Sequence, residues 1–150
     1  MNREIRLATA ADSSAVRALV WAAYSPYVAR IGREPGPMGD DYDALIRDGR
    51  VHVIGEGEQI LGLLVLLPEP DTMLLDNVAV DPAHQGSGVG RALLQWAEQA
   101  ALGAGFSVIR LYTNEAMTEN VSLYSRIGYV ETGRGEEKGL KRVYMTKRLR

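Results

Sequence analysis

The sequence predicts an α/β protein with a mixed, mostly antiparallel central sheet and helices on both faces. Three observations lead to this fold class. Strand-like segments and segments with apolar residues at helical spacing follow one another along the chain. Glycine and proline clusters separate these segments. No internal repeat or second linker interrupts the order, which we expect to be strand, two helices, three strands, helix, strand, helix and two strands.

The chain begins with a short strand and a helix. Ile5 and Leu7 alternate with charged residues, as in a strand with one buried face. Residues 9–12, Thr-Ala-Ala-Asp, resemble a capping box and predict the start of the helix. Its buried stripe is expected to consist of four apolar residues at helical spacing, Val16, Leu19, Val20 and Ala23.

A broken region follows this helix. Pro26 and the glycine- and proline-rich residues 32–37 interrupt helical structure. Residues 40–48 then suggest a short second helix, which Gly49 ends. We expect this region to face a substrate, because irregular segments between regular elements carry many binding residues.

Three strands are expected to run as a meander. Residues 51–54 and 59–67 predict a hairpin around the glycine-rich turn 55–58. Residues 68–71 contain two prolines and turn the chain into a third strand at 72–80.

The second half of the chain predicts a helix, a strand, a helix and a hairpin. The first helix spans 88–102, the strand 106–113, the second helix 117–127, and the hairpin pairs 129–131 with 140–149. In the first helix, apolar residues recur at helical spacing: Val89, Leu93, Trp96, Ala97 and Ala100. Protection of exposed strand edges explains the basic C-terminal residues, which are Lys138, Lys141, Arg142, Lys147, Arg148 and Arg150.

Composition limits the classes of function. The chain has 150 residues, which predicts one domain over 1–150 with one active site. A net charge of −2 argues against a nucleic-acid partner that needs a broad basic face. The longest apolar stretch, residues 60–67, is far shorter than the roughly 18 residues of a membrane helix. No signal-like segment follows Met1, so we expect a soluble cytoplasmic protein without a membrane partner.

Side-chain chemistry narrows the mechanism further. The chain contains no cysteine, which removes disulfides, thiolate metal sites and a cysteine acyl-enzyme. His52 and His84 do not stand at metal-ligand spacing with each other or with paired carboxylates. We therefore predict no metal and a direct transfer reaction, or one through serine.

Residues 76–94 predict a buried strand, a glycine turn and the start of a helix. The first amides of a helix lack internal partners and lie at the positive end of its dipole, so this turn suits a diphosphate. A dinucleotide fingerprint would need glycine where Arg91 stands, and a nucleotide-triphosphate loop would need Gly-Lys-Ser/Thr. On the loop alone, a plain glycine turn that caps a helix is an equal alternative.

The spacing Gln85-x-x-Gly88-x-Gly90 resembles the acyl-CoA loop of the GCN5-related N-acetyltransferases, the GNAT superfamily. A second motif of that family, with an Asn, a Leu-Tyr pair and a Gly-aromatic exit, lies about thirty residues later at 110–129. The order of elements matches the family over nearly the whole chain. The resemblance implies acetyl-CoA as co-substrate and no metal. It also implies a sheet that splays between its fourth and fifth strands, at 74–80 and 106–113.

By this resemblance, pantetheine pairs with the main chain near Val78 and Val80, and an amide near Val78 stabilises the acetyl oxygen. Core packing is the alternative for both valine side chains, and both roles can hold together. The diphosphate is expected on the glycine loop. The full set of expected cofactor-binding residues is Val78, Ala79, Val80, Gln85, Gly86, Ser87, Gly88, Val89, Gly90, Arg91, Asn120 and Tyr124.

Two residues are expected to carry the chemistry. Tyr124 stands at the family's position for the acid that protonates the leaving thiolate, and its alternative is a packing role. A phenol of ordinary pKa, about 10, would face only about 2 kcal/mol in that transfer. Asp76, expected on the same strand face as Val78, is the candidate base, and its alternative is a solvated strand-end charge. Glu69 and Asp71 are weaker candidates for the base.

The acceptor is expected at the broken region, which offers aromatic and acidic side chains suited to a cationic amine: Trp21, Tyr24, Tyr27, Tyr42, Asp40, Asp41 and Asp43. Helix packing and helix-start charges are the alternative roles. We expect an acetyl-CoA-dependent N-acetyltransferase that acts on the primary amine of a small molecule. A protein lysine or N-terminal acceptor, a silent acyl-CoA sensor and a nucleotide-binding regulator are the alternatives. Family members often form dimers, so the resemblance allows a homodimer.

Overall fold

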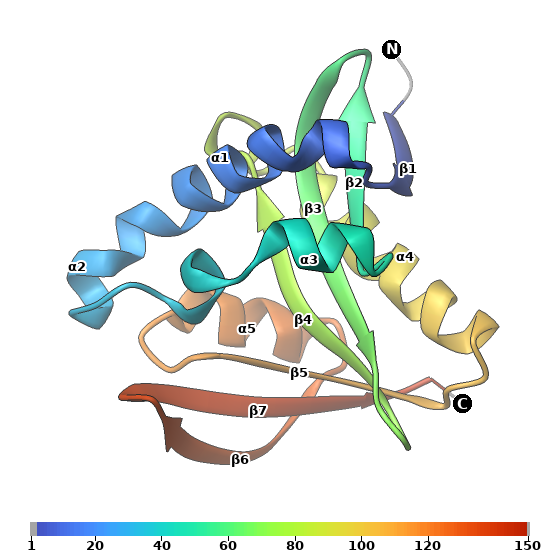
Figure 1. Cartoon of the computed structure of the whole chain (residues 1–150). Coiled ribbons are helices and arrows are strands. Elements are labelled where there is room, and N and C mark those ends of the chain that lie inside the picture. The colour runs from blue at the N-terminus through green and yellow to red at the C-terminus, as the bar shows by residue number, and fades with distance from the viewer. Residues whose placement is uncertain (1–2, 150) are drawn as a thin grey trace.

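The computed structural model describes residues 3–149 and contains a seven-stranded sheet in the order β1-β2-β3-β4-β5-β7-β6 (Figure 1). Neighbouring strands are antiparallel except β4 and β5, which are parallel. The mixed, mostly antiparallel sheet that the sequence predicts is confirmed. The strands are β1 Arg3–Leu7, β2 Val51–Glu56, β3 Gln59–Pro68, β4 Met73–Val80, β5 Val108–Asn114, β6 Val130–Glu137 and β7 Leu140–Arg148.

Helices cover both faces of this sheet, as predicted (Figure 1). The two helices α1 and α3 pack on one face, whereas α4 and α5 pack on the other. Short 3-10 turns flank several of them and fill the broken region. The helices are α1 Ser13–Tyr24, α2 Val28–Ile31, α3 Tyr42–Arg47, α4 Val89–Gly103 and α5 Thr118–Arg126.

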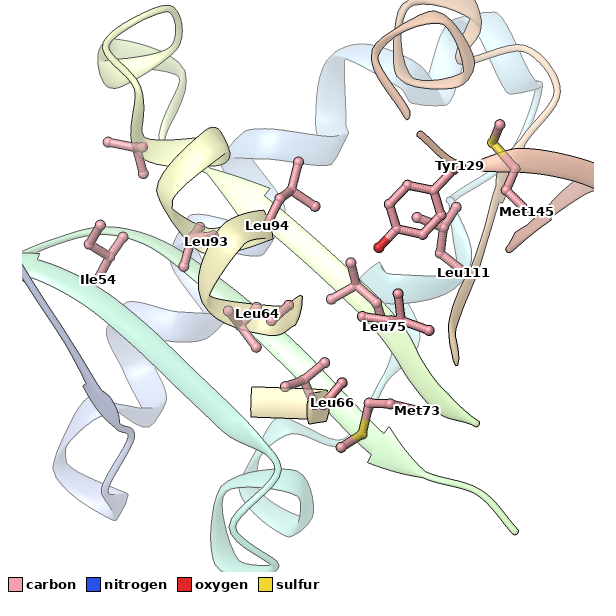
Figure 2. Packing of buried hydrophobic residues seen from close by; sticks show 14 of the residues in the cluster. Ile54, Leu64, Leu66, Met73, Leu75, Leu93, Leu94, Leu111, Tyr129 and Met145 are labelled. Atoms are coloured by element: carbon pink, nitrogen blue, oxygen red, sulfur yellow. The ribbon is translucent and has the colours of Figure 1, made fainter. Parts of the chain in front are cut away.

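The core consists of two apolar clusters, one on each side of the sheet. Figure 2 shows Leu93 and Leu94 of α4 over the sheet residues Leu64 and Leu75. On the opposite face, the predicted stripe of α1, Val16, Leu19, Val20 and Ala23, is buried throughout. Burial of apolar area on both faces supplies the main favourable term for folding.

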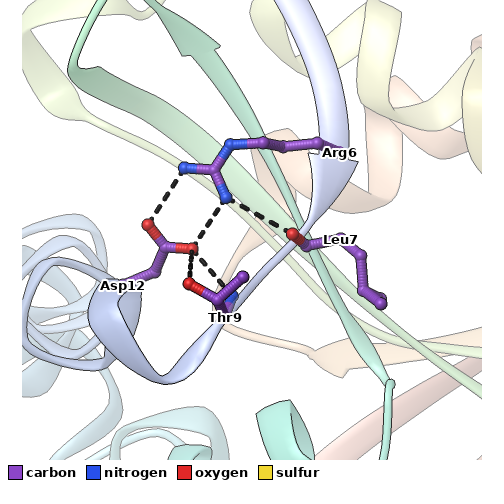
Figure 3. A network of polar contacts seen from close by, with 4 residues as sticks. All are labelled: Arg6, Leu7, Thr9 and Asp12. Carbon is purple, nitrogen blue, oxygen red and sulfur yellow. Dashed lines mark hydrogen bonds and ion pairs between the residues drawn. The ribbon is translucent and has the colours of Figure 1, made fainter.

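The turn between β1 and α1 is held by Asp12 (Figure 3). Both carboxylate oxygens accept from Arg6, at 2.7 and 3.0 Å. The Thr9 amide and hydroxyl donate to Oδ2 at 2.8 and 3.2 Å. The predicted capping function of residues 9–12 is therefore present, although it starts a 3-10 turn at Ala10 and the α-helix begins at Ser13.

Replacing Asp12 by asparagine is expected to lower the free energy of unfolding at pH 7 by about 1 kcal/mol. The hydrogen bond from Arg6 lowers the pKa of Asp12 from 3.8 to about 2. Because the folded-state pKa is the lower one, the stabilisation is complete above pH 3.8 and is lost as the pH falls through about 2. Urea unfolding from pH 7 downward measures the difference between the two proteins, which should narrow below pH 4. A difference independent of pH would contradict this account.

The closing hairpin differs from its prediction in two respects. Its first strand, β6, extends to Glu137, because Gly133 and Gly135 pair with β7 instead of ending the strand. In addition, β7 lies between β5 and β6 and is not an edge strand. Edge protection is therefore the wrong explanation for its basic residues. Lys147 instead binds Glu98 of α4 at 2.9 Å, and Arg150 lies outside the described residues.

The pairing of β4 with β5 positions the site. Only three residue pairs join the two strands, and the last is Leu75 with Leu111. Beyond that pair the two ribbons run apart in Figure 1. On its other side, β4 has a bulge opposite β3: Val65 pairs with Asn77 and Leu66 with Leu75, so Asp76 is the extra residue.

Candidate active site

Three adjoining cavities form a path from the start of α4 to the point where β4 and β5 separate. The first, here called the loop cavity, lies at the start of α4. The second, the groove, runs along β4 and shares four residues with the first, Val80, Gln85, Gly90 and Leu123. The third, the inner cavity, lies between β4 and β5. Val78 and Tyr124 line both the groove and the inner cavity, so the path passes between these two residues.

The glycine loop forms the wall of the loop cavity. Gly86 and Gly88 have φ of +80° and +88°, a left-handed conformation that favours glycine. Gly88 is the N-cap of α4, so the amides that follow it begin the helix. The first amides of a helix have no internal acceptor and attract anions. The loop therefore fits a diphosphate, and Gln85 and Arg91 also line this cavity.

Two residues of the loop, Ser87 and Val89, do not line the loop cavity. Val89 is 1% exposed and packs in the core beneath α4, so only its backbone is available to a ligand. The Ser87 hydroxyl donates to the carbonyl of His84, and its own carbonyl accepts from Arg3 at 2.9 Å. Both side chains hold the shape of the loop.

The bulge decides where Asp76 points. Val78 and Val80 pack toward the cluster on the α4 side, whereas Asp76 accepts a hydrogen bond of 2.7 Å from the Tyr112 hydroxyl. Tyr112 alternates with Leu111, which belongs to the α4-side cluster. The expectation that Asp76 shares a strand face with Val78 was therefore wrong, because the extra residue breaks the alternation on which it depended. Asp76 still lines the inner cavity.

Tyr124 and Asn120 come from successive turns of α5 and line both the groove and the inner cavity. The ring of Tyr124 also packs edge-on against Tyr129, with centroids 5.7 Å apart. Packing and access to the cavities therefore coexist. Within residues 3–149 no hydrogen bond involves the Tyr124 hydroxyl, so it is free to donate to a ligand.

Comparison with known proteins fits this geometry. The model of the Acetyltransferase (GNAT) family matches residues 14–129. The chain belongs to the GNAT family of acetyltransferases. It is an N-acetyltransferase that uses acetyl-CoA, as the loop and the α5 motif predict.

Among the relatives of this GNAT chain is the S-(2-succino)cysteine N-acetyltransferase of Bacillus subtilis, 30% identical over 100% of this chain and 98% of that protein. The PaiA N-acetyltransferase of Thermoplasma acidophilum, solved with coenzyme A, has a TM-score of 0.83 and 16% identity, and 99% of each chain is covered. The ribosomal-protein-S18-alanine N-acetyltransferase of Escherichia coli has a TM-score of 0.74 and 16% identity over 99% of this chain and 94% of that one. At such low identity the two structures show a common fold.

The acidity of Tyr124 differs from the expectation of an unperturbed phenol. Burial raises the pKa of its hydroxyl to about 12 in this GNAT site. Against a thiol of ordinary pKa, about 8.5, the proton transfer would then cost about 5 kcal/mol rather than about 2. The same apolar surroundings raise the pKa of a buried thiol, because desolvation disfavours thiolate as it does phenolate. The difference between donor and acceptor is thereby reduced.

The other acidic candidates have different surroundings. Glu69 accepts two hydrogen bonds of 2.6 Å from Arg110, which lowers the pKa of its carboxyl and removes it as a free base. Asp71 is exposed in the turn before β4, away from the inner cavity. Asp40 is exposed as a residue, but desolvation of its carboxyl, followed by the charge of Asp76, raises its pKa to about 6.

A buried hydrogen-bond network at the wall of the inner cavity was not predicted. The Tyr24 hydroxyl donates to the side-chain oxygen of Asn77, and Asn77 donates to the Tyr42 hydroxyl at 3.0 Å. Tyr42 in turn donates to the carbonyl of Pro37 at 2.6 Å. Asn77 is 4% exposed. An asparagine within an apolar strand is the only sequence signal for this hydrogen-bond network. The network connects the broken region to β4.

The predicted acceptor residues separate into two groups. Tyr24 and Tyr27 line the groove, and Tyr24 also lines the inner cavity. Trp21 does not line either of them and is 66% exposed. Two of the aspartates have structural roles: Asp41 caps α3 through the amide of Ala44, and Asp43 binds Arg17 at 2.9 Å. Helix-start charge is therefore the correct reading for these two.

The histidines take part in packing and loop contacts. His52 stacks on Trp96 with ring centroids 4.3 Å apart, and His84 contacts Gln59 at 3.2 Å. Over residues 3–149, no cluster of three or more acidic, histidine or cysteine side chains is arranged to hold a metal ion. In that same range no helix has the length and apolarity to span a membrane.

Proposed function

We propose that this GNAT enzyme transfers an acetyl group from acetyl-CoA directly to the primary amine of a small molecule. The row of adjoining cavities from the glycine loop to the inner cavity is the observation that carries this proposal. The inner cavity is bordered by the loop Pro35–Pro37, by the strands β4, β5 and β7, and by residues of α1 and α5. A small acceptor suits a cavity bounded in this way. The name of the Bacillus subtilis relative also specifies a small cysteine derivative.

In this proposal the chain holds the donor in an extended form along β4. The amides at the start of α4, with Gln85 and Arg91, bind the diphosphate. The main chain near Val78 and Val80 pairs with the pantetheine amides. The bound acetyl-CoA supplies an activated thioester at the junction of the groove and the inner cavity.

Three protein groups then serve the transfer. An amide near Val78 stabilises the negative charge that develops on the acetyl oxygen. Asp76 takes a proton from the incoming amine, either directly or through water, while Tyr112 orients its carboxylate. Tyr124 donates the proton that the leaving sulfur requires. Neutralising a lysine-like amine at pH 7 costs about 4.6 kcal/mol, so the base has the heaviest task.

Replacing Asp76 by asparagine is expected to lower kcat/KM for the amine about 100-fold, because a general base contributes this order of magnitude. Steady-state rates from pH 5 to 9 measure the profiles of both proteins, and the variant should be slower than the parent throughout this range. Asp71→Asn, in an exposed turn outside the cavity, is the matched control. Superimposable profiles of parent and Asp76→Asn would exclude the proposed base.

Two other functions compete with this one. The Escherichia coli neighbour has a name that specifies a protein alanine as acceptor, so the fold also accommodates polypeptides. A silent sensor would bind acetyl-CoA and release no thiol above background in the presence of amines. A screen of purified protein against amino acids, polyamines, amine drugs and N-terminal peptides separates these functions, with mass gain on the amine as the readout. Acetylation of peptides alone would replace the small-molecule proposal.

We propose that residues 1–150 act as one catalytic domain and that the reaction occurs in the cytoplasm, where acetyl-CoA is available. We also propose a homodimer, because members of this family often form dimers. Light scattering on the purified chain tests it, since a monomeric mass at micromolar concentration would exclude a stable dimer.

A further inference from the structure

We propose that the acceptor amine carries a carboxylate and that Arg142 binds it. This inference rests on the proposed small-molecule transfer and names its substrate class. Arg142 lies on β7 and lines the inner cavity together with Asp76 and Tyr124. From the sequence alone, Arg142 was assigned only to a basic C-terminal segment. Its position in the folded chain is what suggests a binding role.

The guanidinium of Arg142 is held in place. Its side chain is 15% exposed, and its central carbon lies 4.2 Å from the centroid of the Tyr112 ring. Nη1 donates to Glu137 at 2.6 Å. Such stacking and pairing fix the plane of the guanidinium and reduce the entropy lost when a ligand binds.

Part of this guanidinium remains available. Within residues 3–149, no hydrogen bond involves Nε or Nη2 of Arg142. Nη2 lies close to the loop Pro35–Pro37 that borders the cavity, since a β-carbon placed on Gly36 would be 3.7 Å from this nitrogen. Glu137 is 56% exposed and accepts from Nη1 alone. An arginine donates through five N–H groups, so a ligand carboxylate can occupy the remaining ones.

The charges around the cavity are separated along Tyr112. Asp76 lies at the hydroxyl end of this ring, and Arg142 lies on its face. Asp40, which does not line the inner cavity, is a further carboxylate near both groups: desolvation raises its pKa to about 6, and among the neighbouring charges Asp76 raises it and Arg142 lowers it. An amine that also carries a carboxylate matches both ends: the nitrogen is directed toward Asp76 and Tyr124, and the carboxylate toward Arg142. An amine without a carboxylate would leave the remaining donors of the Arg142 guanidinium without an acceptor in the same space.

Matched pairs of amines test the inference on the unmodified enzyme. L-Phenylalanine with phenethylamine, and L-methionine with 3-(methylthio)propylamine, differ only in the α-carboxylate. Aspartate, glutamate and S-carboxymethylcysteine extend the carboxylate series. We expect at least a 10-fold higher kcat/KM for the carboxylated member of each pair that reacts, since hydrogen bonds to charged groups contribute this much.

Variants then assign the preference to Arg142. Arg142→Met should reduce kcat/KM for carboxylated amines roughly 10- to 100-fold, mainly through KM, and change that for decarboxylated amines by less than about threefold. Arg142→Lys should recover part of the loss. Arg134→Met is the control, because Arg134 is a 54% exposed side chain on β6 that binds Glu131 outside the cavity. The KM for acetyl-CoA should be the same in all four proteins.

The outcomes separate this inference from the function on which it rests. If the unmodified enzyme acetylates the decarboxylated amines with a kcat/KM equal to or higher than that for their carboxylated partners, the carboxylate inference is overturned and the transfer function stays intact. An equal loss for both members of a pair in Arg142→Met also overturns it, since it indicates general damage. Acetyl-CoA binding without acetylation of any amine overturns the proposed function, and the inference with it.

Discussion

Replacing Tyr124 by phenylalanine should lower kcat by roughly 100-fold or more and leave the Kd for acetyl-CoA within about threefold. Within residues 3–149 the Tyr124 hydroxyl has no hydrogen-bond partner. Tyr124 lines the groove and the inner cavity at their junction, where the thioester is expected. Phenylalanine would remove the proposed proton donor for the leaving sulfur, whereas the ring would keep its packing against Tyr129. Stopped-time thiol release and equilibrium binding measure the two quantities.

Tyr129 supplies a matched control for this variant. Its hydroxyl is buried without a hydrogen-bond partner in the described chain, and its ring touches Tyr124. Tyr129→Phe therefore removes a hydroxyl from the same aromatic pair without removing a proposed donor, and should retain full turnover. If Tyr124→Phe also retained full turnover, Tyr124 would be a packing residue and the sulfur would take its proton from water.

Much of the fold could be predicted because most helices and strands have a recognisable pattern in their own sequence. The stripe of Val16, Leu19 and Val20 predicts a helix with one buried face, and that face is buried. The interior position of β7 could not be predicted in the same way. Strand order depends on which strands pair across long sequence separations, and the basic residues of β7 suggested an edge instead. The local sequence pattern therefore predicts whether a segment is a helix or a strand better than it predicts which strands lie next to each other in the sheet.

The site shows the same division. The glycine loop and α5 carry short motifs, so their place on the path was expected, and the roles of their residues stay predictions. Arg142 and Tyr112 carry no motif. They meet Asp76 only because β7 pairs with β5 and because β4 has a bulge at Asp76. A one-residue bulge redirects a side chain to the other face of the sheet, and simple alternation in the sequence does not reveal it.

A leucine in place of Gly90 should weaken binding of coenzyme A at least 100-fold. Gly90 lines both the loop cavity and the groove, and a β-carbon at this position would lie 3.5 Å from Val80. The longer leucine side chain would fill the space expected for the diphosphate and separate it from the helix amides. Two charge-assisted hydrogen bonds of about 1.5 kcal/mol or more are then lost, and each 1.4 kcal/mol is tenfold in Kd. Calorimetric titration with coenzyme A measures the change.

The same titration on three proteins tests the central claim, that the start of α4 binds the diphosphate and directs the thioester along β4. The parent and Gly103→Leu should bind coenzyme A equally, because Gly103 is the exposed last residue of the same helix and has open space around it. Leucine favours a helix over glycine at both positions, so a loss of helix propensity does not explain a difference. The account predicts equal binding by the parent and by Gly103→Leu, and binding at least 100-fold weaker by Gly90→Leu. Equal affinity of all three proteins, or no binding by the parent, would contradict it.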